Sequence, residues 1–357
     1  MKIAFVNTSR GWGGAEEQML AMALELERRG NSISVVARRN GLVQQRFEHS
    51  GYHVLPVDRT GFSAVIAPFA AAIRAVKERF DIIHCHRDHD LLLGALLAKP
   101  RRIPLLLTQH CLPGKPNLFV YGLADQIITV SAYIASGIRA KLPAIGPRLG
   151  VIVNGIDLHM FSDPDRNFWG RHSLIGFCRP LLGVVGAFYK GQDELIGMLP
   201  ALRKIFPQLA LILIGEDDSR KPALVELAER LGVAEAVVFF GRIPREQMKD
   251  ALAGLDLNVS AFRNEGFGLT VIEGLAVGTP FVGYRAGGYP EIVTCDAAGV
   301  LVDDAPAFVE AVVRMLRDQI HPITSRLDNC ASVAAEFTLS RMIDAYETLY
   351  GALKGRA

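Results

Sequence analysis

The chain has 357 residues, of which 50% are hydrophobic and 21% charged, and its formal net charge is +2. This composition excludes an intrinsically disordered protein, and the length favours two domains over a single core. The longest apolar runs, such as Leu91 to Ala98, fall far short of the ~20 residues that a membrane-spanning helix needs.

Short apolar runs rich in β-branched residues alternate with longer helical patterns in the first half of the chain, as expected for βαβ units on a parallel sheet. Ala15 to Arg29 and Ala132 to Lys141 show the clearest helical periodicity. The expected strands are Ile3 to Val6, Ser32 to Val36, His53 to Pro56, Asp81 to His84, Leu105 to Thr108, Gln126 to Val130 and Val151 to Val153.

The pattern changes between Asn154 and Pro180, where turn residues are frequent, so we expect a linker there. The chain after Phe308 contains helical patterns only, and the last of them, an amphipathic helix, begins at Leu339. The expected strands between the linker and this tail are Leu182 to Val185, Leu209 to Ile214, Val237 to Phe240, Leu257 to Val259, Pro280 to Val282 and Val300 to Val302.

These patterns predict an α/β protein of two Rossmann-like domains, each a doubly wound parallel sheet. We expect an N-terminal domain over residues 1–165 and a C-terminal domain over residues 180–338, with the helix 339–357 packing back on the first. Ligands of such sheets bind outside the carboxyl ends of the strands, so we expect the site in a cleft where the two domains face each other.

A glycine-rich turn follows the first strand and contains Gly13 and Gly14 directly before a helix. Such a turn exposes helix N–H groups to a ligand, or it merely connects strand to helix. The spacing differs from G-x-G-x-x-G, and Ala37 to Arg39 stand where a ribose-binding acid would end the second strand. NAD binding is therefore not expected.

Two loops in the second half carry residues suited to a diphosphate. Lys190 lies between a strand and a helix, where its charge can neutralise phosphate. Glu265 and Glu273 are eight residues apart, and a helix beginning near Gly268 would point its first N–H groups at an anion. The two carboxylates then reach different groups, a sugar and a ribose diol; the alternative is that both are solvated surface charges.

Histidines and one cysteine crowd together at His84, Cys85, His86 and His89, as metal ligands do. In a strand, however, His84 and His86 share one face and Cys85 points to the other. We therefore predict no metal site. For His84, a buried and hydrogen-bonded position in the core is as good an interpretation as a role in the functional site.

The chain resembles the retaining glycosyltransferases of family 4, which have the GT-B fold, over nearly its whole length. The segment Gly13-Gly14-Ala15-Glu16, the strand Asp81 to His86 and Asn154-Gly155-Ile156-Asp157 are similar to that family. The stretch from Glu265 to Glu273 is the most specific match.

The resemblance assigns roles to residues. It implies that Glu265 contacts donor-sugar hydroxyls, that Glu273 holds the ribose and that Lys190 neutralises the diphosphate. It also implies that His110 lies near the donor sugar. The catalytic residues that it implies are His110, Lys190 and Glu265. The remaining donor-binding residues that it implies are Gly13, Gly14, Gly186, Glu216, Gly241, Arg242, Gly266, Phe267, Gly268, Leu269 and Thr270, of which Gly268, Leu269 and Thr270 bind the distal phosphate.

One position departs from the family pattern. The family has an arginine directly after the glycine of the lysine motif, and this chain has Ala187 after Gly186. Arg242, Arg245 and Arg263 are the candidates to replace it.

By resemblance the protein moves a sugar from a nucleotide-diphosphate sugar to a carbohydrate or lipid-linked acceptor, in the assembly of bacterial envelope polysaccharide or lipopolysaccharide. It needs no cofactor and no metal, and no nucleic-acid partner is expected. A nucleotide-sugar epimerase of the same architecture and a non-catalytic GT-B scaffold remain alternatives.

Basic residues are in excess in the first part of the chain. Residues 1–150 carry 19 Lys and Arg against 11 Asp and Glu. This excess either marks a site for an anionic acceptor or membrane surface, or it is ordinary solvated charge.

The five scattered cysteines favour a reducing compartment. The apolar run before Asn7 is too short for a secretory signal. We expect a cytoplasmic protein, with peripheral contact at the inner face of the membrane left open.

Overall fold

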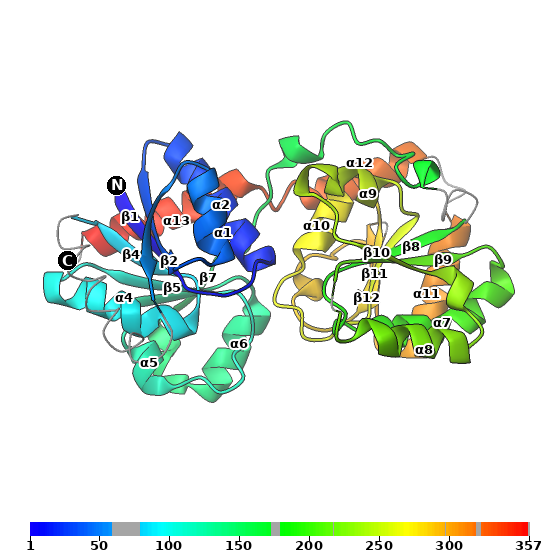
Figure 1. The fold of residues 1–357 in the computed structure, drawn as a ribbon, viewed down its shortest axis with the longest axis horizontal. Helices are drawn as coiled ribbons and strands as arrows, with labels where there is room; N and C mark the ends of the chain where they lie inside the picture. The colour runs from blue at the N-terminus through cyan, green and yellow to red at the C-terminus, as the bar shows by residue number, and fades with distance from the viewer. Residues whose placement is uncertain (59–78, 173–178, 217, 297, 319–322, 356–357) are drawn as a thin grey trace. The chain divides into compact units, whose positions relative to one another are not determined.

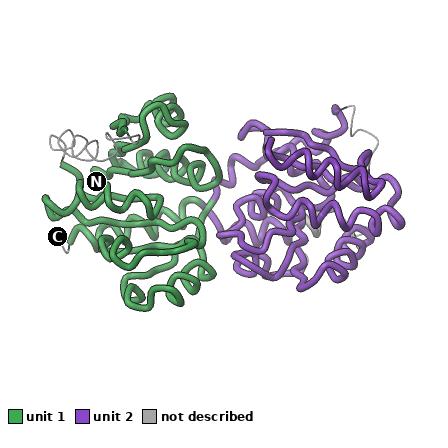
Figure 2. Tube along the Cα trace, turned by 60° about the horizontal axis from the view of Figure 1, so that its bottom comes forward, with its two compact units in different colours: residues 1–155, 339–357 green, residues 156–338 purple. Residues whose placement is uncertain are grey.

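The computed structural model describes residues 1–58, 79–172, 179–216, 218–296, 298–318 and 323–355 (Figure 1). The chain divides into two units, of which unit 1 contains residues 1–155 and 339–357 and unit 2 contains residues 156–338 (Figure 2). Each strand expected from the sequence is present, with its ends shifted by at most two residues.

Unit 1 is built on a sheet with the order β3-β2-β1-β4-β5-β6-β7, in which every neighbouring pair is parallel. Its strands are β1 (Lys2–Asn7), β2 (Ser32–Arg38), β3 (His53–Val57), β4 (Ile82–Cys85), β5 (Leu105–Gln109), β6 (Gln126–Thr129) and β7 (Leu149–Val151). Its helices are α1 (Gly14–Arg28), α2 (Leu42–His49), α4 (Leu91–Ala98), α5 (Leu118–Gly122), α6 (Ala132–Lys141) and α13 (Leu339–Lys354).

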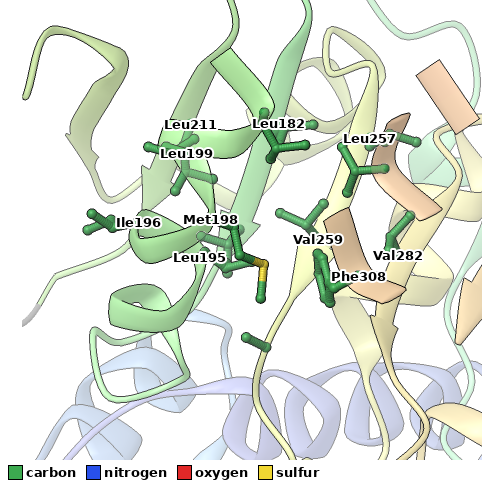
Figure 3. Packing of buried hydrophobic residues seen from close by; sticks show 14 of the residues in the cluster. Leu182, Leu195, Ile196, Met198, Leu199, Leu211, Leu257, Val259, Val282 and Phe308 are labelled. Carbon is green, nitrogen blue, oxygen red and sulfur yellow. The ribbon is translucent and has the colours of Figure 1, made fainter. Parts of the chain in front are cut away.

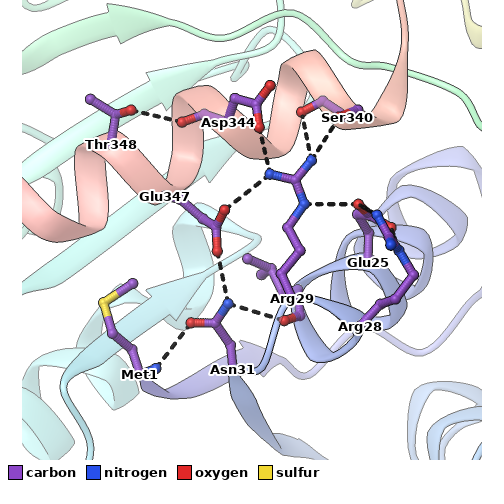
Figure 4. Close-up of polar contacts among 10 residues, drawn as sticks. Met1, Glu25, Arg28, Arg29, Asn31, Ser340, Asp344, Glu347 and Thr348 are labelled. Atoms are coloured by element: carbon purple, nitrogen blue, oxygen red, sulfur yellow. Dashed lines mark hydrogen bonds and ion pairs between the residues drawn. The ribbon is translucent and has the colours of Figure 1, made fainter.

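The C-terminal helix α13 is part of the core of unit 1. Met342, Tyr346, Tyr350 and Leu353 repeat at the spacing of one helix face and are all buried there. A polar cluster joins the same helix to the end of α1, where Arg29 donates to Asp344, Glu347 and Ser340 of α13 and to Glu25 of α1 (Figure 4).

Unit 2 contains a parallel sheet with the order β10-β9-β8-β11-β12-β13. Its strands are β8 (Leu181–Val185), β9 (Ala210–Ile214), β10 (Val237–Gly241), β11 (Leu257–Ser260), β12 (Phe281–Tyr284) and β13 (Gly299–Val302). Its helices are α7 (Gln192–Ile205), α8 (Lys221–Arg230), α9 (Met248–Ala253), α10 (Leu269–Ala276), α11 (Ala305–Asp318) and α12 (Ile323–Ala334).

The core of unit 2 lies between this sheet and the helices α7, α8 and α11. Leu182, Leu211 and Leu257 of the strands face Leu199 of α7 and Phe308 of α11 (Figure 3). Strands that are covered on both faces have apolar residues at nearly every position, which is why they were recognisable in the sequence.

The segment expected to be a linker, 154–180, is mostly packed onto unit 2. Trp169 is fully buried, and its Nε1 donates a hydrogen bond to the carbonyl oxygen of Ala251 at 2.8 Å. Residues 156–165, which we expected in the first domain, therefore group with unit 2, and the boundary falls between Gly155 and Ile156. Residues 173–178 of the expected linker lie outside the described part of the chain.

Among the helices of the described residues, none combines the length and the apolar character needed to cross a bilayer.

Candidate functional site

Each sheet has one point where the strand order reverses, and ligands of doubly wound sheets bind outside the carboxyl ends of the strands at that point. In unit 1 the reversal lies between β1 and β4, and in unit 2 between β8 and β11. The loops that follow β8 and β11 contain Lys190 and Glu265, and the loop that follows β4 contains His86.

In unit 2 the loops after β8 and β11 meet in an ion pair. Lys190 lies between β8 and α7, Glu265 lies between β11 and α10, and Lys190 Nζ is 2.8 Å from Glu265 Oε2. Their side chains are 25% and 21% exposed, so both can still reach a ligand. The lysine is thus held at the reversal point, where a diphosphate is expected to bind.

The backbone at the ends of β8 and β9 approaches unusually closely. The N–H of Gly186 donates to Ile214 and that of Gly215 donates to Gly241, both at 2.9 Å. Gly215 has φ 148°, and a Cβ there would lie 2.3 Å from the carbonyl oxygen of Gly186. Only glycine fits at Gly215. A Cβ on Gly186 would lie 2.9 Å from Lys190 Cδ, so the Lys190 side chain packs directly over the backbone of Gly186.

Helix α10 begins directly after Gly268, which has φ 113° and forms the N-cap without a side-chain hydrogen bond. Among the described residues, no acceptor bonds the first N–H groups of this helix, at Leu269 and Thr270. The helix start expected near Gly268 is confirmed. These N–H groups and the helix dipole favour an anion at this end.

The loop that leads into α10 is fixed by packing. Gly266 and Phe267 are buried, and the Phe267 ring lies 5.8 Å from that of Phe337 in an edge contact. The N–H of Gly288 donates to the carbonyl oxygen of Glu265 at 2.9 Å. Glu265 therefore projects from a backbone that the rest of unit 2 holds in place.

Glu273, in the second turn of α10, is not a solvated surface charge. Its side chain is only 5% exposed, and Arg245 Nη1 lies 2.5 Å from its Oε1. The Arg245 guanidinium also lies 5.4 Å from the centre of the Phe161 ring. A buried carboxylate needs such a partner, because removing an isolated charge from water is costly.

The three arginines proposed to replace the one missing at Ala187 have different surroundings. Arg263 binds a glutamate of α7 through two nitrogens and stacks on Tyr284. Arg242 pairs with Glu216 at 2.8 Å, and both side chains are more than half exposed. Arg245 alone of these three pairs with a residue of α10.

In unit 1 the glycine-rich turn is organised by a residue that the sequence motifs did not assign, Glu16. This buried carboxylate accepts from Asn7 Nδ2 at 3.2 Å, from Ser9 Oγ at 3.0 Å and from the N–H of Gly13 at 3.1 Å, and Arg87 Nη2 lies 2.7 Å away. Burial by itself raises its pKa, but the charge of Arg87 and these hydrogen bonds outweigh burial and lower the pKa.

The Gly13-Gly14 turn therefore has a fixed conformation at the start of α1, with Gly13 as the N-cap. An acidic residue at the third helical position after the N-cap is the sequence feature that could have indicated Glu16. Nothing local in the sequence indicated Arg87, which comes from the end of β4.

The histidines of unit 1 form a row at the ends of β4 and β5. His84 is a core histidine, because its Nδ1 bonds Tyr350 Oη at 2.8 Å and its Nε2 bonds Thr108 Oγ1 at 2.7 Å. The His86 ring stacks on it with centroids 4.2 Å apart, and His86 Nδ1 lies 3.4 Å from His110 Nε2.

All three imidazoles lie in surroundings that favour the neutral form. Burial lowers the pKa of His84 and of His86 well below the usual value, and burial together with the charge of Arg87 lowers the pKa of His110 to about 4. His86 and His110 are therefore uncharged near neutral pH.

The predicted site residues are thus distributed over both units. Gly13, Gly14 and His110 lie in unit 1, and the other members of the set lie around the carboxyl edge of unit 2. Within the described ranges, no group of three or more His, Cys, Asp or Glu residues is arranged to hold a metal ion. Four of the five cysteines are described as free thiols, and Cys178 lies outside the described residues.

Two doubly wound parallel sheets, one in each unit, are the architecture of the GT-B class of proteins. Comparison with family models agrees, because the model described as Glycosyltransferase Family 4 matches residues 12–160 and the model described as Glycosyl transferases group 1 matches residues 179–318. The chain belongs to glycosyltransferase family 4, and it is an enzyme that transfers glycosyl groups.

Curated relatives have low sequence identity to this chain, over most of its length. D-inositol 3-phosphate glycosyltransferase of Corynebacterium diphtheriae is 25% identical, with 95% of this chain and 90% of that protein covered. N-acetyl-alpha-D-glucosaminyl L-malate synthase of Bacillus anthracis is 26% identical, with 77% and 76% covered.

Solved structures show the same fold. HepE of Anabaena, crystallised with UDP-glucose, matches with a TM-score of 0.85 at 22% identity, over 98% of this chain and all of that one. Sucrose-phosphate synthase of Thermosynechococcus elongatus matches with a TM-score of 0.85 at 21% identity, over the whole of both chains.

Proposed function

We propose that this glycosyltransferase takes its sugar from a nucleotide-diphosphate sugar and retains the anomeric configuration during transfer. In this proposal unit 2 binds the donor: Lys190 and the N–H groups of Leu269 and Thr270 receive the diphosphate, Glu273 the ribose and Glu265 the sugar hydroxyls. His110 of unit 1 acts near the transferred sugar.

The observation that carries the donor assignment is the Lys190–Glu265 ion pair at the reversal point of unit 2, beside the uncapped start of α10. Departure of a nucleoside diphosphate requires stabilisation of the developing negative charge, which a cation and aligned N–H groups supply without a metal. The structures of HepE with UDP and with UDP-glucose support a nucleotide sugar as the ligand of this fold.

For the acceptor, we propose a carbohydrate or lipid-linked precursor of a bacterial envelope polysaccharide or lipopolysaccharide, used on the cytoplasmic side of the membrane. Fold similarity to the lipopolysaccharide glycosyltransferase WaaG supports this choice, at 16% identity. A small anionic acceptor is the second candidate, because curated relatives are named for inositol 3-phosphate and L-malate.

The donor assignment is tested by titrating UDP, GDP and ADP into the full chain by calorimetry and repeating the titration with Lys190→Ala and Glu273→Ala. We expect one nucleotide to bind selectively and both variants to weaken it. Arg203→Ala is a matched control, since it breaks an ion pair with Glu235 at the far end of the same helix, α7, that follows the Lys190 loop.

Product analysis then separates the reaction types. A transferase converts the donor only when an acceptor is present, apart from slow hydrolysis, whereas an epimerase interconverts nucleotide sugars without one. Failure of all three nucleotides to bind would overturn the donor assignment and favour a non-catalytic scaffold.

A further inference from the structure

Two carboxylates of the proposed donor site in unit 2 each pair with a cation from another loop. Lys190 Nζ is 2.8 Å from Glu265 Oε2, and Arg245 Nη1 is 2.5 Å from Glu273 Oε1. Arg245 comes from the segment between β10 and α9, at the start of a short 3-10 helix. The proposed function gives a role to both carboxylates and to the lysine, and it leaves the arginine without one.

The Glu273 carboxylate lies close to the place where the diphosphate is expected. Glu273 is four residues after Leu269, the first residue of α10, so the two positions share one helix face about 6 Å apart along the axis. Side chains of a helix tilt toward its N-terminus, which brings the carboxylate nearer to the first turn. An uncompensated negative charge there would repel a diphosphate over this short distance.

The charge of Arg245 acts on Glu273 with little screening by water. The Glu273 side chain is 5% exposed and that of Arg245 is 33% exposed, whereas the neighbouring pair of Arg242 and Glu216 is 62% and 53% exposed. Solvent weakens an exposed pair much more than a buried one. The Arg245 guanidinium also lies over the Phe161 ring, 5.4 Å from its centre, which restricts the positions that it can take.

We propose that Arg245 is the second cation of the donor site, where it offsets the charge of Glu273 so that a diphosphate can bind beside that carboxylate; this assignment rests on the proposed function. It supplies from another loop the positive charge that the chain lacks at Ala187. The two ion pairs then sum to zero charge, and the first N–H groups of α10 add their attraction for an anion. Loss of Arg245 alone leaves the four side chains with a net charge of −1.

Inorganic pyrophosphate is the first probe, because it has the charge of a diphosphate and no ribose. Its binding to the full chain is measured by calorimetry at low salt. Arg245→Met should weaken this binding by about three- to ten-fold, and Glu273→Gln should tighten it by a similar factor. The double variant Arg245→Met/Glu273→Gln has the net charge of the wild type, so its affinity should stay within about two-fold of the wild-type value.

Further variants separate charge from folding. Arg245→Met leaves a buried carboxylate without its cation and lowers stability, so chemical unfolding measures the folded fraction of every variant. Arg245→Lys keeps the charge and should recover most of the pyrophosphate binding. Arg203→Met is the matched control, because it also removes the arginine of an Arg–Glu pair in unit 2, at the end of α7 far from the Lys190 loop. It should change pyrophosphate binding by less than about two-fold.

A purely structural role for Arg245 predicts a different pattern. If the arginine only orients Glu273 toward the ribose, Arg245→Met weakens the binding of a nucleoside diphosphate and leaves that of pyrophosphate unchanged. This result would overturn the proposal. A double variant that binds pyrophosphate as weakly as Arg245→Met would also overturn it, because the net charge would then not determine the affinity.

Nucleotide titrations on the same samples keep this proposal apart from the donor assignment. If a nucleoside diphosphate binds while pyrophosphate binding is absent or independent of Arg245, the role of Arg245 is wrong and the donor assignment stands. If pyrophosphate binding follows the charge of the variants and no nucleotide binds, the role of Arg245 in anion binding stands and the donor assignment fails.

Discussion

The Lys190–Glu265 ion pair predicts opposite effects for its two members on nucleotide binding. In the free enzyme Glu265 neutralises Lys190, with Oε2 and Nζ 2.8 Å apart. A diphosphate must therefore share the lysine with that carboxylate or displace the carboxylate from it. Lys190→Met removes the cation and keeps the length of the side chain. Glu265→Gln removes the competing negative charge and keeps the cation.

The magnitudes follow from the geometry. A charge-assisted hydrogen bond contributes about 1.5–3 kcal/mol, and the lower end applies because a quarter of the Lys190 side chain is exposed and already paired. Lys190→Met should therefore weaken nucleoside diphosphate binding about ten-fold. Glu265→Gln should tighten it about two- to five-fold, since roughly 0.5–1 kcal/mol of repulsion is removed.

Calorimetry with nucleoside diphosphates at low and high salt is the assay, and sugar transfer is measured in parallel. Both effects should shrink as salt rises, because the pair is partly exposed. Transfer by Glu265→Gln should fall even though its product binds more tightly, since the carboxylate is predicted to hold the sugar. Weaker nucleotide binding by Glu265→Gln, or no change in Lys190→Met, would refute this account of the site.

Three further predictions concern stability and are measured by chemical unfolding. Gly215→Ala should destabilise unit 2 by at least about 2 kcal/mol, because φ is 148° and the new Cβ meets a carbonyl oxygen at 2.3 Å; Gly197→Ala, with open space in α7, should stabilise by about 0.5–1 kcal/mol. Arg29→Ala should cost about 1–3 kcal/mol, because it removes the ion pairs that join the end of α1 to α13 (Figure 4). The exposed neighbour Arg28→Ala should cost under about 0.5 kcal/mol. The pKa of His84 is lowered in the folded state, so the unfolded state binds a proton first as the pH falls. The stability present above about pH 6.5 is therefore lost below that pH, by at most about 1.4 kcal/mol per pH unit for this residue. His84→Gln should flatten this dependence of stability on pH, and an unchanged slope in the variant would contradict the prediction.

The strands were predictable because parallel strands buried on both faces are continuous apolar runs. Every residue of β5, Leu105–Gln109, is buried, and such a run is recognisable without knowledge of its neighbours. The packing of the segment after Asn154 was not predictable in this way. Its turn residues resemble those of a linker, and Trp169 is attached to unit 2 by contacts with residues far along the chain.

The same distinction applies to the site. The start of α10 at Leu269 depends on local sequence, and it was predicted. The pairing of Glu273 with Arg245 and of Glu16 with Arg87 depends on which loops the sheets bring together. No local pattern specifies those pairs, and the binding roles of all these residues remain predictions.

The buried carboxylates lie at the same edges of the two sheets as the predicted site residues. In the described part of the chain, the buried acidic residues are Glu16, Asp90 and Glu273, and each follows the carboxyl end of a strand beside a reversal point. Desolvating a charge costs several kcal/mol, and apolar residues of similar volume are often at least as stabilising as a buried ion pair. Stability alone therefore gives no reason to keep carboxylates there. Their position is explained if these edges bind ligands that are rich in hydroxyl groups, since carboxylates that are already desolvated and fixed accept hydrogen bonds from such groups without reorganisation.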